Sequence, residues 1–242
     1  MSHLIVGDGH YCGAPGEAEG WARLLRSAHA QGVREVSILG DFFELWIGLR
    51  GLDAAWQEPL FAPLRELKAA GVTLRYVWGN KDFFIEDWNC RIKLFDVVTD
   101  QLRLETPAGS VYLEHGDLVN TADRQYRLWR ALSRSAPFSL LARALPRRWL
   151  ARAAERAAEK MRASNRYHKS YFPEDQLRAQ ARALPPGPAT LVFGHFHVHH
   201  ELTEGDKKII TLPFLGGECA GIWLDAAGVR IFKAESAPSQ GD

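Results

Sequence analysis

The chain has 242 residues, of which 46% are hydrophobic and 24% are charged, and its formal net charge is +1. This composition excludes a largely disordered chain, and the length suffices for one large domain or one domain with an insertion. No apolar run is long enough to span a bilayer and no signal peptide is evident, so we expect a cytoplasmic protein. Three cysteines without close pairing, Cys12, Cys90 and Cys219, exclude a disulfide framework and a zinc knuckle.

The charges are unevenly distributed along the chain. Residues 124–182 hold 15 Lys and Arg against 4 Asp and Glu, whereas the remainder holds 15 basic and 25 acidic residues. The basic segment predicts an anionic partner, either the phosphate of a ligand or a lipid surface. Because aromatic residues are few in this segment and it has no reader motif, we expect no nucleic-acid partner, and nothing indicates an obligate protein partner.

The first half of the chain alternates strand and helix patterns. Apolar runs at 4–6, 36–39 and 73–78 predict strands, and residues 16–32 and 53–71 show the apolar spacing of helices. This order predicts a right-handed, largely parallel unit, in which helices connect neighbouring parallel strands.

The second half contains a helical insertion between strands. Residues 102–105 and 111–114 predict a hairpin, whereas residues 120–182 lack strand patterns and are rich in Ala, Leu and Arg. The later strand patterns lie at 190–193, 208–212 and 221–233. Because no helix interrupts these last strands, we expect them to form a second sheet packed on the first.

Polar side chains follow five of the predicted strands, and the carboxyl ends of strands line one crevice in an open α/β sheet. The candidate ligands at these ends are Asp8, His10, Asp41, Asn80, His115, His195 and His197. They supply about three ligands for each of two divalent ions, with Asp41 as the natural bridge. A donor set of imidazole, carboxylate and amide without thiolate favours Mn²⁺, Fe²⁺ or Zn²⁺.

The motifs that contain these residues resemble those of the calcineurin-like metallophosphoesterases. The motifs are Asp8-Gly-His10, Gly40-Asp41-Phe-Phe-Glu44, Gly79-Asn80-Lys81-Asp82, His115-Gly-Asp117 and Gly194-His195-Phe-His197, in this order. The resemblance implies an α/β four-layer sandwich, in which helices flank two packed mixed sheets, with a helical lid as an insertion. We expect a core of residues 1–119 and 183–235, a lid of residues 120–182 and a tail of residues 236–242.

Two further stretches narrow the resemblance within this superfamily. The loop from Asp41 to Gly48 and the motif Thr121-x-Asp123-x-x-Tyr126 are similar to the UDP-2,3-diacylglucosamine hydrolase family of lipid A biosynthesis. Met161-Arg162-Ala163 matches a turn in that family's lid. The resemblance implies hydrolysis of UDP-2,3-diacylglucosamine to UMP and 2,3-diacylglucosamine 1-phosphate (lipid X), by metal-activated water attacking the α-phosphorus.

The same resemblance implies residue roles and two divalent cations, for which Mn²⁺ is our first choice. One ion would be held by Asp8, His10, Asp41 and His197, and the other by Asp41, Asn80, His115 and His195. The implied substrate contacts are Asn80, Lys81, Asp123, Arg162 and His195, with Ser164, Asn165 and Lys169 as further candidates.

Lys81 stands where many relatives carry a histidine that protonates an alkoxide leaving group. A lysine is a poor proton donor at neutral pH. Cleavage of a pyrophosphate expels a phosphate monoester, whose pKa is near 6, so this leaving group needs charge neutralisation more than a proton. Lys81 therefore favours a pyrophosphate substrate, because its positive charge would stabilise the negative charge that develops on the leaving phosphate.

The lid segment combines apolar and basic side chains. The apolar residues Leu140, Leu141, Leu145, Trp149 and Leu150 lie near Arg143, Arg147, Arg148 and Arg152 in the sequence. This combination suits two acyl chains and a diphosphate, and also a peripheral position on the cytoplasmic face of an anionic inner membrane. The apolar residues suit the lid's own core equally well, and the arginines also suit a solvated face.

Two other functions are compatible with these motifs. One is a metallophosphoesterase that acts on another nucleotide diphosphate or phosphodiester. The other is a non-catalytic binding scaffold, although such scaffolds typically lose ligands that are all present here. We expect Glu44, Asp82 and Asp117 to orient ligands or to cap loops in any of these cases.

Overall fold

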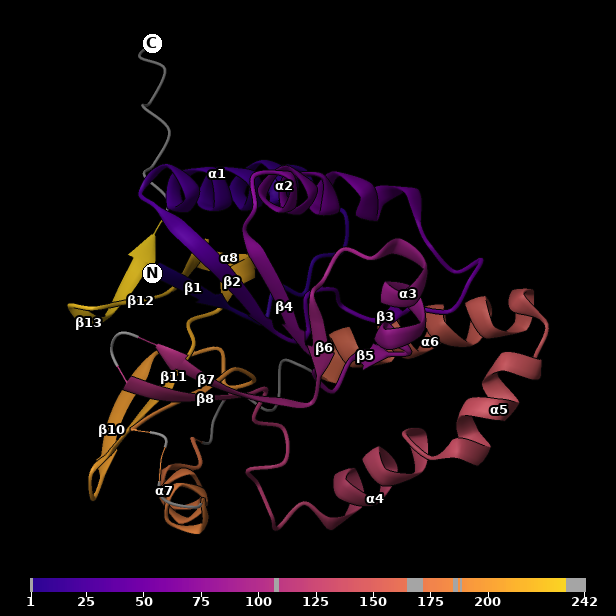
Figure 1. Ribbon diagram of the computed structural model, residues 1–242. Coiled ribbons are helices and arrows are strands. Elements are labelled where there is room, and N and C mark those ends of the chain that lie inside the picture. The colour runs from indigo at the N-terminus through magenta and orange to yellow at the C-terminus, as the bar shows by residue number, and fades with distance from the viewer. Residues whose placement is uncertain (1, 107–108, 165–171, 185–186, 188, 234–242) are drawn as a thin grey trace.

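The computed structural model describes residues 2–106, 109–164, 172–184, 187 and 189–233, with the side chains of 160–164 and 217–218 outside that description. Figure 1 shows two sheets packed on each other, helices on both outer faces, and three helices that project to one side. The helices are α1 (Glu17–Ala30), α2 (Glu58–Ala69), α3 (Ile85–Ile92), α4 (Arg124–Ser133), α5 (Ala136–Ala144), α6 (Arg147–Ser164), α7 (Glu174–Ala183) and α8 (Leu215–Glu218), and the short 3-10 helix η1 (Ala55–Gln57) precedes α2.

The first sheet has the strand order β13-β12-β1-β2-β4-β6. Its strands are β1 (Ser2–Val6), β2 (Val33–Leu39), β4 (Thr73–Val77), β6 (Val97–Thr99), β12 (Ala220–Asp225) and β13 (Gly228–Lys233). Strands β1, β2, β4 and β6 are parallel to one another, whereas β12 runs antiparallel to β1. The parallel part is the predicted βαβ unit, whose connecting helices cover one face.

The second sheet has the order β10-β11-β9-β8-β7 and is also mixed. Its strands are β7 (Gln101–Thr106), β8 (Gly109–Glu114), β9 (Thr190–Phe193), β10 (His200–Glu204) and β11 (Lys207–Thr211). The predicted hairpin at 102–114 is the antiparallel pair β7–β8. A separate two-residue parallel pair joins β3 (Trp46–Ile47) to β5 (Asp82–Phe83), which lie in the segments that follow β2 and β4.

Three apolar cores hold the layers together. Helix α1 presents Trp21, Leu24 and Leu25 at helical spacing, and these residues pack with α2 on the outer face of the first sheet. Ile5 of β1 packs with Val192 of β9 between the two sheets. Helix α7 packs on the outer face of the second sheet. The order helix, sheet, sheet, helix confirms the expected four-layer sandwich.

The C-terminal hairpin corrects one expectation. Strands β12 and β13 extend the first sheet, because β12 pairs with β1 through Leu4 and Trp223, whereas we expected all the last strands in the second sheet. The alternation of this strand explains the position: Ile222 and Leu224 point into the core between the sheets, and Trp223 points into the core beneath the helices. A strand with two buried faces fits beside β1 as well as in a second sheet.

The segment between β8 and β9 divides into two parts. Helices α4, α5 and α6 form an arm beside the sandwich, whereas α7 is the fourth layer, with Leu177 and Ala181 buried against Leu191 of β9 (Figure 1). The boundary of the lid at residue 182 stays a prediction. In the described part of the chain no helix has both the length and the apolar character of a membrane span.

Candidate metal centre

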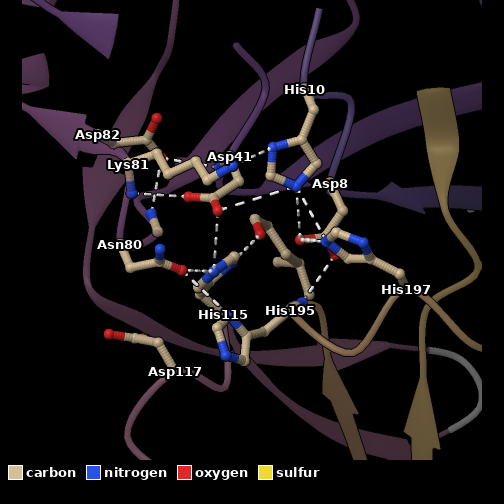
Figure 2. A network of polar contacts seen from close by, with 12 residues as sticks. Asp8, His10, Asp41, Asn80, Lys81, Asp82, His115, Asp117, His195 and His197 are labelled. Atoms are coloured by element: carbon tan, nitrogen blue, oxygen red, sulfur yellow. Dashed lines mark hydrogen bonds and ion pairs between the residues drawn. The ribbon is translucent and has the colours of Figure 1, made fainter. Parts of the chain in front are cut away.

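The seven predicted ligands converge from five strand ends on one pocket (Figure 2). Asp8 and His10 follow β1, Asp41 follows β2, Asn80 follows β4, His115 follows β8, and His195 and His197 follow β9. The two sheets therefore both contribute, and their strand ends meet at the same edge. This position is the one at which open α/β sheets bind ligands.

The backbone is strained where it delivers these side chains. Eight non-glycine residues of the described chain have positive φ. Five of them are candidate ligands: Asp8 (55°), His10 (47°), Asp41 (49°), His195 (70°) and His197 (58°). Such conformations each cost of order 1–3 kcal/mol and cluster at functional sites. The strand exits are thus bent to aim these groups into the pocket.

One group of ligand atoms lies around Asp8. The Nε2 atoms of His10 and His197 are 2.9 Å apart, and His197 Nε2 lies 3.5 Å from Asp8 Oδ1. Asp8 is fully buried, and its Oδ1 atom has no hydrogen-bond partner, whereas Oδ2 accepts the backbone N–H of His195 at 2.7 Å. A buried carboxylate oxygen without a partner is costly, and a cation at this point would satisfy it.

A second group lies around Asn80. Its Oδ1 atom is 2.9 Å from His115 Nε2 and 3.0 Å from His195 Nδ1. The other ring nitrogen of His115, Nδ1, lies 2.7 Å from the carbonyl oxygen of Leu39. This contact fixes the ring and leaves Nε2 directed at the pocket, as is usual for histidines that bind metals.

Asp41 lies between the two groups. Its Oδ2 atom is 4.0 Å from His10 Nε2 and 3.7 Å from His115 Nε2, whereas Oδ1 accepts the backbone N–H of Lys81 at 2.8 Å. One oxygen is thus held by the protein and the other faces both sets of ligands. The atoms of Asp8, His10 and His197, and those of Asp8, Asp41 and His115, lie within 4.8 Å of one another in each set.

The electrostatics of the pocket favour cations. Burial, together with the charge of Lys81, lowers the pKa of His10 to about 2, and burial lowers that of His195 to about 4, so both rings are neutral and carry a free lone pair. Burial raises the pKa of Asp41 to about 7. Burial opposes a charge on His115, but Asp41 and Asp8 raise its pKa to about 9. A divalent cation would supply the positive charge that these carboxylates require, so the residues fit a metal site.

Asp82 and Gly79 bring the ends of β2 and β4 together. Asp82 Oδ2 accepts the backbone N–H of Asp41 at 3.0 Å, that of Gly79 at 2.6 Å and the hydroxyl of Tyr76 at 2.9 Å. A Cβ atom at Gly79 would overlap the Asp41 carboxylate and lie 2.8 Å from His115 Cε1, so only glycine permits this approach. Asp82 thus orients a ligand loop, in agreement with its expected supporting role.

Lys81 and Glu44 lie beside His10. Lys81 is 4% exposed, and its Nζ donates to Glu44 Oε1 at 3.0 Å and lies 3.0 Å from His10 Nδ1. Glu44 Oε2 is 3.7 Å from the same Nδ1 atom. These contacts place a buried charge pair behind a candidate ligand. The direct contact of Lys81 with substrate stays a prediction.

The remaining predicted site residues lie toward the arm. Asp117 is buried, forms an ion pair with Arg130 and accepts the hydroxyl of Tyr126, and Figure 2 shows it apart from the ligands. Asp123 is the N-cap of α4, where its Oδ1 accepts the backbone N–H of Tyr126 at 2.9 Å. Arg162 and Ser164 belong to α6, but their side chains lie outside the described part of the structure, as do Asn165 and Lys169 entirely.

Sequence reasoning missed two arginines at the C-terminal end of α4, Arg130 within the helix and Arg134 at its C-cap. Arg130 pairs with Asp117, and Arg134 donates to the carbonyl oxygen of Gly79 at 2.7 Å. Both appeared only as members of a long basic segment. The spacing of three or four residues places Arg124, Arg127, Arg130 and Arg134 on one face of a helix, so the sequence does not distinguish the last two from the first two.

Comparisons with known proteins agree with this geometry. The model of the calcineurin-like phosphoesterases matches residues 1–199. A UDP-2,3-diacylglucosamine hydrolase of Pseudomonas fluorescens is 32% identical over 211 residues, which cover 84% of this chain and 83% of that protein. One of Azotobacter vinelandii is 32% identical over 214 residues, which cover 85% and 86%.

A solved dimetal phosphatase of Danio rerio shares the fold at 13% identity, with a TM-score of 0.51, and the likeness covers 97% of this chain and 99% of that one. The matched residues include all seven candidate ligands, and divalent metal use is common to the family. The chain therefore belongs to the calcineurin-like phosphoesterases, as a hydrolytic enzyme that acts on a phosphate ester or anhydride bond.

Proposed function

We propose that this chain hydrolyses the pyrophosphate bond of UDP-2,3-diacylglucosamine to UMP and 2,3-diacylglucosamine 1-phosphate, a step of lipid A biosynthesis. The observation that carries the proposal is the juxtaposition of a buried polar pocket with an arm of exposed apolar and basic side chains. The names of relatives about 30% identical over most of the chain support the same substrate.

The proposed cofactors are two divalent cations, with Mn²⁺ as the first choice because imidazole, carboxylate and amide donors suit it. We assign Asp8, His10, Asp41 and His197 to one ion, and Asp41, Asn80, His115 and His195 to the other. When bound, such ions activate water and neutralise charge on the phosphorus oxygens. The protein contributes a pocket in which Asp41 faces both ligand sets.

The reaction needs no strong general acid. The oxygen of water forms a bond to the α-phosphorus, the bond from this phosphorus to the bridging oxygen breaks, and the diacylglucosamine phosphate leaves with the electron pair. The proton of the water passes to solvent. Because the leaving phosphate has a pKa near 6, it departs without protonation, and the ammonium group of Lys81 stabilises its charge. Asn80 and His195 border the same pocket and are proposed substrate contacts.

The arm offers surface for acyl chains. Leu140, Leu141 and Trp149 are 67%, 59% and 58% exposed, although they are large apolar residues. A cavity of about 230 Å³ between the arm and the core is lined by Trp78, Phe83, Phe84, Glu86, Asp87, Ser133, Arg134, Ser139 and Arg143. The aromatic part of this lining suits a hydrocarbon chain and the arginines suit phosphate.

The exposed apolar residues and the basic segment also support a position on the cytoplasmic face of the inner membrane, where the acylated substrate resides. We propose Asp123 and Arg162 as further substrate contacts, with Ser164, Asn165 and Lys169 as additional candidates.

Product analysis in ¹⁸O-labelled water tests the proposal. Metal-loaded protein is mixed with UDP-2,3-diacylglucosamine, and the products are identified by mass spectrometry. The proposal expects UMP that carries the label and lipid phosphate that does not. Labelled lipid phosphate would contradict attack at the α-phosphorus, and intact substrate alongside cleavage of another nucleotide diphosphate or phosphodiester would favour a metallophosphoesterase of different specificity.

A further inference from the structure

Helix α4 is attached to the loop that follows β4. Arg134, at the C-terminal end of the helix, donates from Nη2 to the carbonyl oxygen of Gly79 at 2.7 Å. Its guanidinium carbon lies 3.7 Å from the ring centroid of Trp78 and 5.3 Å from that of Phe83. The arginine therefore holds the peptide that immediately precedes Asn80, through a charge-assisted hydrogen bond and through stacking on two aromatic rings.

The same helix is attached to the loop that follows β8. Arg130 Nε lies 2.6 Å from Asp117 Oδ2, and the hydroxyl of Tyr126 donates to that same oxygen. The guanidinium carbon of Arg130 also lies 5.3 Å from the ring centroid of Trp78. Asp117 is 4% exposed and follows His115 by two residues, so this buried pair restrains a second ligand loop.

These two loops supply one side of the pocket. Each restrained loop carries one candidate ligand, and the two ligand atoms, Asn80 Oδ1 and His115 Nε2, are 2.9 Å apart. Among the described residues, the hydrogen bonds and ion pairs of α4 reach these loops and not the loop of Asp8 and His10. A shift of α4 would therefore disturb Asn80 and His115 directly, whereas it would reach Asp41 and His10 only indirectly, through Lys81.

We infer that Arg134 is a positioning residue, which acts through Gly79 and Asn80, so that docking of the arm sets the affinity of one of the two ions. The inference rests on the proposed two-ion centre. Groups that orient ligands from behind typically change metal affinity by about 10–100-fold when they are removed. The expected effect of losing Arg134 is a loss of this size for the ion at Asn80, with little change for the ion at Asp8.

A titration of metal-free protein with Mn²⁺ tests this asymmetry, with free Mn²⁺ measured by its electron paramagnetic resonance signal. We expect two ions in the wild-type protein. In Arg134→Ala we expect one ion of wild-type affinity and a second ion that binds about 10–100-fold more weakly. Arg134→Lys keeps the charge but lacks the planar fork, so it should weaken the second ion to a smaller extent and provides the test if the alanine variant does not fold.

Arg143→Lys is the matched control. Arg143 of α5 donates to Asp87 of the core at 2.8 and 3.0 Å and lies 5.4 Å from the ring centroid of Phe84, so it also ties the arm to the core. Among the described residues, its hydrogen bonds do not reach Gly79 or the loop that follows β8. We expect both affinities to be unchanged. Fewer than two ions in the wild-type protein would contradict the two-ion centre itself. With two wild-type ions, the inference is overturned by unchanged affinities in Arg134→Ala, by equal weakening of both ions, or by the same loss in Arg143→Lys.

Discussion

The metal pocket and the arm are built in different ways. In the pocket, each candidate ligand follows a strand. Asp8, Asp41 and His115 are buried, the other four are partly buried, and they already contact other groups of the chain. In the arm, Leu140 and Trp149 are largely exposed, and much of the surrounding surface is basic. The backbone of the strands therefore positions the ligands of the pocket. The exposed side chains of the arm, in contrast, are available to bind a separate molecule. Function on this account requires both.

The largest effect is expected from Asp41→Asn, which breaks the pocket. The substitution keeps the size of the side chain but removes the charge that faces both ligand sets. We expect kcat to fall about 10³-fold or more, because loss of shared ligand charge costs several kcal/mol of transition-state stabilisation. Activity and metal content by mass spectrometry provide the measurement. Asp53→Asn, at an exposed carboxylate, is the control, and two retained ions with wild-type kcat would refute the assignment of Asp41.

Lys81→Met tests whether the pocket needs a charge at this point rather than an acid. Removal of the ammonium group leaves Glu44 without this cation, and we expect kcat to fall about 10²-fold. Lys81→Arg keeps the charge and should retain most of the activity. Because Lys81 also contacts His10, metal content is measured in parallel. Equal activity of the Met variant and the wild-type protein at equal metal content would disprove the role.

Leu140→Ser tests whether the arm binds an acyl chain of the substrate. The side chain is 67% exposed, so its loss should not unfold the protein, but it removes apolar surface for an acyl chain. We expect kcat/KM for the diacylated substrate to fall about 5–10-fold, since burial of a leucine is worth about 1.5–3 kcal/mol when complete. The rate with unacylated UDP-glucosamine should not change. Ile231→Ser on β13, which is 42% exposed, is the control. An equal loss for both substrates would argue against acyl binding at this position.

The smallest effect concerns a buried group far from the pocket. Burial lowers the pKa of His3, whose Nε2 lies 2.9 Å from Ser37 Oγ, to about 4. The unfolded chain binds a proton near pH 6.5 that the folded chain does not, so stability falls as the pH drops from 6.5 toward 4. His3→Gln should reduce this fall by up to about 2 kcal/mol between pH 7 and pH 5. The free energy of unfolding is measured by urea denaturation of the metal-free protein at the two pH values. An identical loss of this free energy in the wild-type protein and in His3→Gln would show that His3 contributes nothing.

The strand ends explain why so much of the pocket was predictable. A short apolar run that stops at a polar residue is a local pattern, and the rule that parallel strands end at one edge converts it into a position in space. Asp8, Asp41 and Asn80 could be placed together on this basis. The contacts of Arg134 could not, because they depend on the angle at which α4 leaves the core, which no local pattern specifies.

Some elements were assigned to the wrong place or missed because their patterns fit more than one environment. Strand β12 has two buried faces, which suits either sheet, and its pairing with β1 is a long-range choice. The sequence did not predict helix α3 or strand β6. The helix has only eight residues and buries two of them, Ile85 and Trp88, and the strand has only three residues. Helix α7 reads as part of the basic segment, yet Leu177 and Ala181 are buried against the second sheet.

The ratio of kcat/KM for UDP-2,3-diacylglucosamine to that for unacylated UDP-glucosamine tests the central claim most directly. Both substrates present the same diphosphate to the pocket, and they differ only in the chains that the arm would bind. The account predicts a preference of at least about 10²-fold for the diacylated substrate with the metal-loaded wild-type protein, because two buried acyl chains contribute several kcal/mol. Equal values for the two substrates would contradict it.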